Sequence, residues 1–332
     1  MTILGQFVIV AAVIVFAGSN LSRYGDVIAE KTGMGRTWVG VVLIASVTSL
    51  PELITGISAI AIFDLPDIAV GNVLGACMFN MLTIALLDVM SGPTPISAKA
   101  HQGQVIAAGF GIILLGLATI GIAGGGTLLR LGWVGSYSFV FLIVYAIAIH
   151  TVFLFEKKRI AEYVQEMVEA SRYENIPLKK AYVNYAWNAV LVIAAAAYLP
   201  YLGEKIAQAT GLGQTFVGSI FISLTTTLPE LVVSIAALRI DAADLVFGNI
   251  FGSNLFNIAI LALDDVLYGK GPLLAHVEPA HIVTASAAMT MTAVAMVGLT
   301  YRLAKKSFLI AWDSIAILAV YVTAVAVVYG MR

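Results

Sequence analysis

Ten continuous apolar runs, each long enough to cross a lipid bilayer, constrain the fold of this chain more than any other feature. A helix needs about 20 predominantly apolar residues to span the hydrocarbon core. The runs lack the alternation of period two that marks β-barrel strands. The sequence therefore predicts an all-α integral membrane protein with ten transmembrane helices. The expected spans are residues 3–22, 36–62, 67–90, 103–123, 131–154, 182–202, 214–239, 242–267, 281–300 and 307–330.

Composition excludes several classes of protein. Hydrophobic residues make up 60% of the 332 positions and charged residues 11%, which leaves little chain for a soluble catalytic domain. The single cysteine, Cys77, excludes a disulfide framework and metal sites built on cysteine pairs. A net charge of -1 provides no basic surface for nucleic acid. The sequence thus indicates no enzyme, cofactor, nucleic acid or protein partner, and its surroundings are the lipid bilayer.

The distribution of basic residues predicts how the chain crosses the membrane. Threading it through ten spans puts all but four of its 18 Lys and Arg residues on one side, the exceptions being Arg130, Lys205, Lys270 and Arg332. Cytoplasmic loops carry the excess of Lys and Arg. We therefore expect a multi-pass protein of the plasma (inner) membrane with both termini outside. Residues 155–181, the one extended polar stretch, are expected to form a cytoplasmic linker helix.

The two halves of the chain repeat one another. Ser-Leu-Pro-Glu at 49–52 recurs as Thr-Leu-Pro-Glu at 227–230, an offset of 178. With one residue deleted, the offset becomes 177 for the next segment. Each half contains five spans, so the second copy must enter the membrane with the opposite orientation. The repeats are therefore inverted, with residues 1–154 as the first and 182–332 as the second. At the offset of 177, Asp64, Asp67, Gly71, Asn72, Gly75, Phe79, Asn80 and Asp88 recur as Asp241, Asp244, Gly248, Asn249, Gly252, Phe256, Asn257 and Asp265.

Glu52 and Glu230 occupy matching positions in the middle of predicted spans. A carboxylate at that depth is costly unless it is paired or solvated, so it marks a substrate or ion pathway by default. No Lys or Arg falls at the same depth. The partner of each carboxylate is therefore a proton, another polar group or a cation. Inverted repeats with broken helices are typical of secondary transporters, whose sites lie near the bilayer midplane.

A proline precedes each glutamate and predicts a supply of free oxygen atoms. Proline in a helix lacks an N–H group and clashes with the carbonyl four residues back, which frees the carbonyls of Val47 and Thr225. Hard cations such as Ca²⁺ prefer six to eight oxygen ligands that include carboxylates. The sequence predicts an all-oxygen cation site. Hydroxyl groups stand beside each glutamate at Thr48, Ser49, Thr226 and Thr227.

Amide-rich segments are expected to complete the site. They run from Gly71 to Asn80 and from Gly248 to Asn257, and in the first the two asparagines lie about two turns apart, near one helix face. Glycines four residues apart allow close helix packing. By contrast, Asp88 and Asp265 fall near predicted span ends, where solvation is the simplest interpretation.

At these residues the sequence resembles the cation/calcium exchanger superfamily, and more narrowly the sodium/calcium exchangers of prokaryotes. The resemblance covers nearly the whole chain and is most specific in two so-called alpha repeats, about residues 36–90 and 214–267. It implies an inverted five-plus-five fold and a secondary active antiporter that exchanges Na⁺ for Ca²⁺ by alternating access. It also implies that both ions share Glu52 and Glu230, that Thr48 and Thr226 give backbone oxygens to Ca²⁺, and that Ser49, Thr227, Asn80, Ser253 and Asn257 help hold Na⁺.

Two positions depart from the family pattern. Gly252-Ser253-Asn254 keeps that pattern, but the first repeat has Gly75-Ala76-Cys77, so one hydroxyl is missing. Asn257 stands where some exchangers carry Asp, which leaves the site with two formal negative charges. Two ionised glutamates would neutralise one Ca²⁺ or two Na⁺, and a neutral loaded site crosses a low-dielectric interior more readily than an empty dianion.

Other functions remain open at the level of sequence. A proton-coupled antiporter of Ca²⁺ or another divalent cation is the main alternative, because two protonated glutamates are also neutral and Ala76 weakens the sodium site. A pH gradient without sodium would drive calcium through that protein. A calcium channel would more typically use a ring of carboxylates around an oligomeric pore. An intramembrane hydrolase could use a carboxylate pair, but no second catalytic group accompanies it.

Overall fold

The computed structural model describes residues 2–32, 48–125, 129–163, 176–306 and 308–331. Within these ranges, nine helices are long and apolar enough to cross a membrane, and they match nine of the ten predicted spans. The tenth span, 36–62, is represented by the short apolar helix Leu50–Phe63, and its earlier part lies outside the described residues. The all-α prediction is confirmed.

The described elements are almost all helices. One two-stranded antiparallel hairpin, β1 with β2, pairs Arg130 with Gly135 and Leu131 with Val134. The elements are α1 (Ile3–Lys31), α3 (Leu50–Ser58), η1 (Ala59–Phe63), α4 (Pro66–Met90), α5 (Ile96–Lys99), α6 (Gln104–Gly124), β1 (Arg130–Leu131), β2 (Val134–Gly135), α7 (Ser136–Tyr163), α8 (Leu178–Thr210), α9 (Gln214–Phe216), η3 (Val217–Ile222), α10 (Ser223–Arg239), α11 (Ala243–Tyr268), η4 (Leu273–Ala275), α12 (His281–Tyr301) and α13 (Trp312–Gly330).

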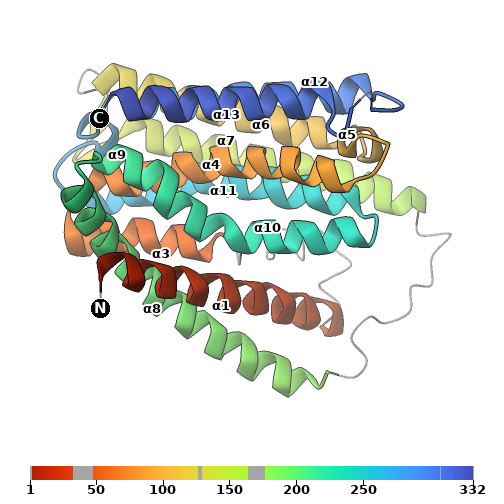
Figure 1. Cartoon of the computed structure of the whole chain (residues 1–332), viewed down its shortest axis with the longest axis horizontal. Helices are drawn as coiled ribbons and strands as arrows, with labels where there is room; N and C mark the ends of the chain where they lie inside the picture. Colours follow the sequence, from red (N-terminus) through yellow and green to blue (C-terminus); the bar gives the residue numbers. More distant parts are fainter. Residues whose placement is uncertain (1, 33–47, 126–128, 164–175, 307, 332) are drawn as a thin grey trace.

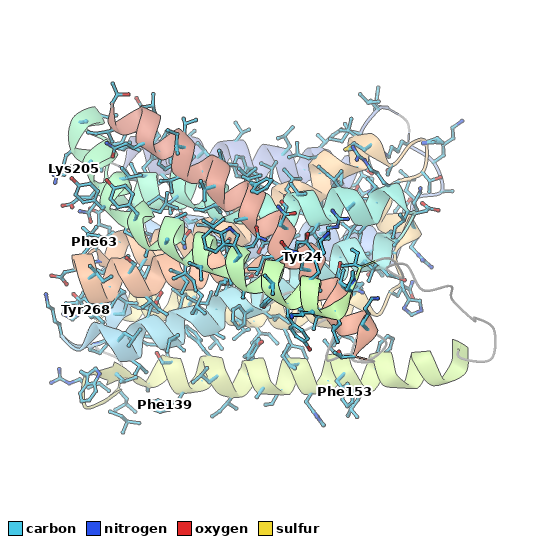
Figure 2. The ribbon with its side chains drawn as sticks, turned by 90° about the horizontal axis from the view of Figure 1, so that it is seen from below. Tyr24, Phe63, Phe139, Phe153, Lys205 and Tyr268 are labelled. Carbon is cyan, nitrogen blue, oxygen red and sulfur yellow. The ribbon has the colours of Figure 1, made fainter. Side chains whose placement is uncertain are left out.

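The helices form a layered bundle in which the repeat segments lie inside (Figure 1). Within the most apolar window of each helix, 83% of α4 and 72% of α11 is buried, against 22% of α1 and 17% of α7. Helices α1 and α8 pack against each other along one edge, and α6, α12 and α13 form the opposite edge. Figure 2 shows α7 at the margin of the bundle, with Phe139 on its outer side. Helices α4 and α11, one from each repeat, thus form the core of the bundle.

Both chain ends lie at the same end of the bundle, as an even number of crossings requires (Figure 1). The C-terminal end of α7 and the start of α8 lie at the opposite end, where the predicted linker begins and ends. Helix α7 continues to Tyr163, beyond the predicted span end at residue 154. Residues 164–175, the middle of the predicted linker helix, lie outside the described part of the chain.

Two aspartates at matching repeat positions turn the chain between helices. Asp64 and Asp241 both have left-handed backbone conformations, with φ of 57° and 58°. Each forms an ion pair with a lysine from the other half of the chain, Asp64 with Lys270 and Asp241 with Lys99. The hydrogen bond to Asp64 raises the pKa of the exposed Lys270 ammonium above its usual value. The inverted symmetry therefore extends from the sequence to the backbone and its ion pairs.

The interpretation of Asp88 and Asp265 as solvated residues was wrong. Both side chains are fully buried. Asp265 accepts hydrogen bonds from the N–H groups of Gly135 and Leu273 and from the hydroxyls of Tyr137 and Ser138. Asp88 accepts from the N–H groups of Ile96 and Ala311 and pairs with buried Lys306. Buried carboxylates need such partners, so these two organise the loops at the helix ends.

Candidate functional site

The two glutamates reach the core by different local routes. In the first repeat Pro51 lies in the first turn of α3, where a missing N–H costs nothing, and Glu52 follows in that turn, favoured by the helix dipole. Residue Ser49 is the N-cap of α3, yet its hydroxyl does not cap the helix. In the second repeat α10 runs continuously through Pro229. A new helix therefore begins next to Pro51, whereas the predicted break in the helix at Pro229 is not seen. Pro229 nevertheless offers no N–H group to the carbonyl of Thr225.

Hydroxyl groups cross between the repeats to reach the carboxylates. Ser49 Oγ donates to Glu230 Oε1 at 3.2 Å, and Thr227 Oγ1 donates to Glu52 Oε1 at 3.2 Å. Both glutamates are fully buried. Thr48 lies beside Glu230, and Thr226 lies beside Glu52. Each carboxylate thus belongs to one repeat and takes its hydroxyl donors from the other.

Asparagines at matching positions attach the core helices to the glutamate helices. Asn72 Nδ2 donates to the Glu52 carbonyl at 3.3 Å, and Asn249 Nδ2 donates to the Glu230 carbonyl at 3.4 Å. Asn72 Oδ1 also accepts from Thr226 Oγ1 at 2.9 Å, which joins the two repeats. Buried amides with good partners fix helix positions strongly. Asn72 and Asn249 therefore hold the backbone at each glutamate, while Asn249 Oδ1 has no hydrogen-bond partner among the described residues.

The core helices cross where two equivalent residues meet. Cys77 and Asn254 occupy the same repeat position, and Asn254 Nδ2 donates to the Cys77 carbonyl at 3.4 Å while Cys77 Sγ lies 3.9 Å from the Asn254 carbonyl. Asn80 Nδ2 donates to Asn254 Oδ1 at 2.9 Å. Asn254 is consequently committed to joining α4 and α11. This is a role that the sequence did not reveal, because its equivalent, Cys77, is chemically unlike it.

Several buried oxygens near the glutamates have no hydrogen-bond partner among the described residues. Unpartnered buried polar atoms are rare in folded proteins, and each one calls for a ligand or another explanation. A group of carboxylate, amide and hydroxyl oxygens suits Na⁺ or Ca²⁺ better than a soft metal. Among the described residues, no group of three or more His, Cys, Asp or Glu side chains is arranged to hold a metal ion. The unpartnered oxygens on the glutamates, and on the asparagines and the serine of α4 and α11, are Glu52 Oε2, Glu230 Oε2, Asn80 Oδ1, Asn249 Oδ1, Ser253 Oγ and Asn257 Oδ1.

Close helix packing seals this region. A Cβ atom at Gly75 would lie 2.2 Å from the backbone oxygen of Ser219, and one at Gly18 would lie 2.6 Å from Pro229 Cγ. The contact at Gly18 packs α1 directly against α10. Helix α8 packs against α3, whose Thr55 and Ser58 hydroxyls donate hydrogen bonds to backbone carbonyls of α8. The two peripheral helices at the edge of the bundle therefore lie directly over the helices that carry the glutamates.

The described candidate residues are all buried in the core. Val47 alone lies outside the described residues, so nothing is said of its carbonyl. Ala76, which lacks the hydroxyl of its equivalent Ser253, is also buried. The ten described candidates, each at most 3% exposed, are Thr48, Ser49, Glu52, Asn80, Thr225, Thr226, Thr227, Glu230, Ser253 and Asn257.

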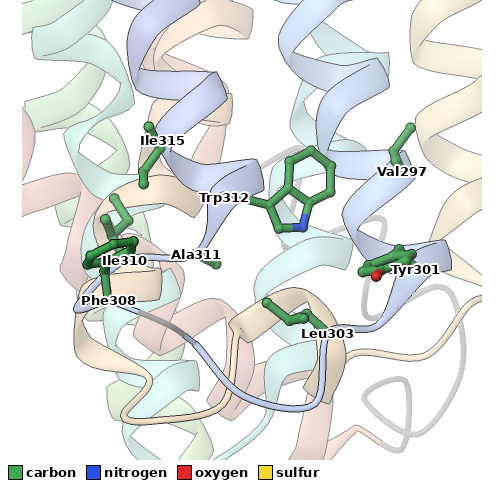
Figure 3. A pocket seen from close by; sticks show the side chains of 8 residues that line it. All are labelled: Val297, Tyr301, Leu303, Phe308, Ile310, Ala311, Trp312 and Ile315. Carbon is green, nitrogen blue, oxygen red and sulfur yellow. The ribbon is translucent and has the colours of Figure 1, made fainter.

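A surface pocket of about 490 Å³ lies away from these residues, between α12, the following loop and the start of α13 (Figure 3). It is lined by apolar and aromatic side chains, among them Tyr301, Phe308 and Trp312. Tyrosine and tryptophan favour the interface between membrane and water. The pocket includes none of the candidate cation ligands, and its lining is of the kind found where a protein meets a bilayer surface.

A family model described as "Sodium/calcium exchanger protein" matches residues 2–154 and 180–330. This chain belongs to the sodium/calcium exchanger family. The two matched segments flank the central linker and contain both glutamate motifs. Family membership makes the chain a transporter embedded in the membrane by multiple spans, in agreement with its apolar helices.

Relatives of this exchanger-family chain match it over most of its length. An uncharacterized membrane protein of Methanocaldococcus jannaschii is 26% identical over 98% of this chain and 98% of its own. The sodium/calcium exchanger MaX1 of Methanosarcina acetivorans is 25% identical over 74% of this chain and 77% of its own. A solved structure of the sodium-calcium exchanger NCX_Mj, soaked with Na⁺ and Sr²⁺, covers 98% of this chain and 97% of its own with a TM-score of 0.63 and 22% identity. This likeness identifies the same fold.

Proposed function

We propose that this protein is a secondary active antiporter, not an enzyme, that exchanges Na⁺ for Ca²⁺ across a membrane. The observation that carries the proposal is the buried pair Glu52 and Glu230, each reached by a hydroxyl from the opposite repeat. Membership of the sodium/calcium exchanger family supports sodium over a proton as the coupling ion. The name of the relative MaX1, a sodium/calcium exchanger, agrees with this choice.

We assign the cation ligands to the buried oxygens of the core. Ca²⁺ would take both glutamates and the backbone oxygens of Thr48 and Thr226, and Na⁺ would take the same glutamates. The unpartnered state of their Oε2 atoms supports these roles. The free carbonyls expected at Val47 and Thr225 would add neutral ligands. The neutral side chains proposed to help hold Na⁺ are Ser49, Thr227, Asn80, Ser253 and Asn257.

Obligatory exchange follows from the charge of the site. Two ionised carboxylates in a low-dielectric interior are costly, whereas one Ca²⁺ or two Na⁺ neutralise them. The empty site therefore resists switching between its outward-open and inward-open states. A cycle that carries three Na⁺ per Ca²⁺ would move net charge and respond to voltage.

The two repeats provide the moving parts. We propose that residues 1–154 and 182–332 form inverted five-helix units joined by a cytoplasmic linker at 155–181. Both termini would then lie outside the plasma membrane, as the positive-inside rule predicts. The position of both chain ends at one end of the bundle supports this topology (Figure 1). Inverted units of this kind exchange conformations around a fixed midplane site.

Calcium uptake into sodium-loaded proteoliposomes tests the proposal. After dilution into sodium-free buffer, wild-type protein should accumulate Ca²⁺, and Glu52→Gln and Glu230→Gln should each reduce the rate at least about a hundredfold, because a buried ligand charge is worth several kcal/mol. Asp241→Asn, which changes an exposed carboxylate, is the matched control and should retain uptake. Uptake driven by a pH gradient alone would favour the proton-coupled alternative. An absence of uptake under either gradient would refute calcium transport.

A further inference from the structure

Another carboxylate is buried within the membrane-spanning core, apart from the cation site. Asp264 lies on α11 and is 0% exposed, and neither of its carboxylate oxygens has a hydrogen-bond partner among the described residues. One oxygen rests against the backbone of α3, since a Cβ atom at Gly56 would lie 2.5 Å from Asp264 Oδ2. Only glycine at position 56 allows this approach. The contact places a bare carboxyl group between a helix of each repeat.

Asp264 lies along the same helices as the candidate cation site but outside that site. Gly56 is one helical turn beyond Glu52 on α3, and Asp264 is seven residues beyond Asn257 on α11, about 10 Å along the same face. The two helices run in the same direction, because Gly56 meets Asp264 and Asp64 meets Lys270. Figure 2 places Phe63 and Tyr268, the last residues of η1 and α11, at the same end of the bundle. Asp264 therefore lies between the glutamates and the face that holds the Asp64–Lys270 ion pair.

The described charged groups around Asp264 provide no counter-ion. On the side of α3 and η1, Glu52 is itself a carboxyl group and Asp64 is already paired with Lys270. On α11 itself, the adjacent Asp265 is occupied by its four donors near the β2 hairpin. Unlike Asp265, Asp264 accepts no hydrogen bond from any residue that the structure describes.

The other elements packed against α11 also leave Asp264 unpaired. Helix α7 contributes Tyr137, which donates to Asp265, and Tyr145. Helix α4 contributes Cys77, Asp67, which is paired with His281, and Asp88, which is paired with Lys306. Helix α10 contributes Glu230 and, in its last turn, Arg239. Lys99 of α5 is paired with Asp241 at the opposite end. Over their described residues, α6, β2 and η4 carry no titratable side chain.

The chemistry of this position suits a proton. A metal ion would require several oxygens around it, whereas a proton requires one. An ionised carboxylate without a partner in a lipid-embedded core is costly, and protonation removes that cost. The equivalent residue in the first repeat is Leu87, also fully buried, so a neutral side chain is accommodated at the matching position.

We propose that Asp264 is a proton-binding site that controls hydration of the path between the glutamates and the Asp64–Lys270 face. The carboxyl group holds a proton while α3 and α11 are packed together. It releases that proton to water on the same face when water enters between the helices, leaving a hydrated carboxylate. The proton enters and leaves from one side, so it is not the coupling ion and no net proton transport results. Acid on that face therefore favours the packed arrangement.

Infrared difference spectroscopy of purified protein between acid and alkaline pH tests this without any transport assay. The proposal predicts a carbonyl band of a buried, protonated carboxylic acid that disappears in Asp264→Asn and Asp264→Leu. The second substitution installs the residue found at the equivalent position of the first repeat. Carboxylic acid bands that are unchanged in both variants would overturn the proposal. So would failure of both neutral variants to fold, because the proposal requires that a neutral side chain at position 264 be compatible with the packed arrangement.

Transport gives the second readout and rests on the proposed exchange function. Wild-type calcium uptake should slow when the Asp64–Lys270 face is acidified, with a contribution from Asp264 of at most about tenfold per pH unit, the limit for one proton. Asp264→Asn should lose that contribution and keep only the pH dependence of the glutamates. Identical pH profiles of wild type and variant would overturn the proposal. If no protein takes up calcium, the exchange function fails, and the infrared result still decides whether Asp264 binds a proton.

Discussion

Ser253 and Ala76 occupy equivalent positions in the two repeats, and changing them tests the sodium ligands directly. Both side chains are fully buried, and Ser253 Oγ has no hydrogen-bond partner among the described residues. A buried hydroxyl without a partner costs about 1–3 kcal/mol. Ser253→Ala should therefore leave the fold equally stable or more stable in the absence of sodium. A residue whose role is only structural would show the opposite sign.

The magnitude in the presence of sodium follows from the lost ligand. An interaction between a hydroxyl and a charged group is worth about 1.5–3 kcal/mol, so sodium binding should weaken by about tenfold or more. At a sodium concentration about 100 times the wild-type dissociation constant, ligand binding stabilises the protein by about 2.7 kcal/mol. A tenfold weaker variant gains only about 1.4 kcal/mol under the same conditions. The difference is large enough to measure as a shift in unfolding temperature.

The assay is thermal unfolding of detergent-purified protein in increasing NaCl, with choline chloride holding the ionic strength constant. Ala76→Ser is the reciprocal variant and should increase the stabilisation by sodium, because it restores the hydroxyl that the first repeat lacks. The double variant moves the hydroxyl from one repeat to the other. An unchanged sodium response in Ser253→Ala would remove Ser253 from the ligand set. Destabilisation without sodium would mean that its hydroxyl is bonded within the protein.

Two further substitutions test the packing around the site. Gly75→Ala should destabilise the protein by about 1–3 kcal/mol and lower its unfolding temperature, because the new Cβ would lie 2.2 Å from the Ser219 backbone oxygen. Gly109→Ala on α6, where nothing lies within 4 Å of the new Cβ, should be neutral or stabilising, and equal effects of the two would contradict the packing. Asp265→Asn should cost about 3 kcal/mol or more, since an amide cannot accept from all four donors, whereas exposed Asp241→Asn should cost at most about 1 kcal/mol. Similar unfolding temperatures for these two variants would refute the loop-organising role of Asp265.

The sequence alone determined the fold class, the inverted repeat and the two buried glutamates. These features are local or periodic: apolar runs set the spans, and a constant offset between Ser49-to-Glu52 and Thr227-to-Glu230 reveals the duplication. An odd number of spans in each half then requires inversion. No long-range contact is needed for any of these steps, because helix formation in a bilayer satisfies the backbone within each segment.

Only the tertiary structure decided which polar groups meet. Hydroxyls from each repeat reach the glutamate of the other, and Cys77 contacts Asn254, so these contacts join residues far apart in the chain. The burial of Asp88 likewise depends on segments that are distant in the sequence. Asp264 had no sequence signal, because its repeat equivalent is Leu87 and it stands near a predicted span end. Hydropathy depends on residue type and neighbours, whereas the free energy of a buried carboxylate depends on what the fold brings against it.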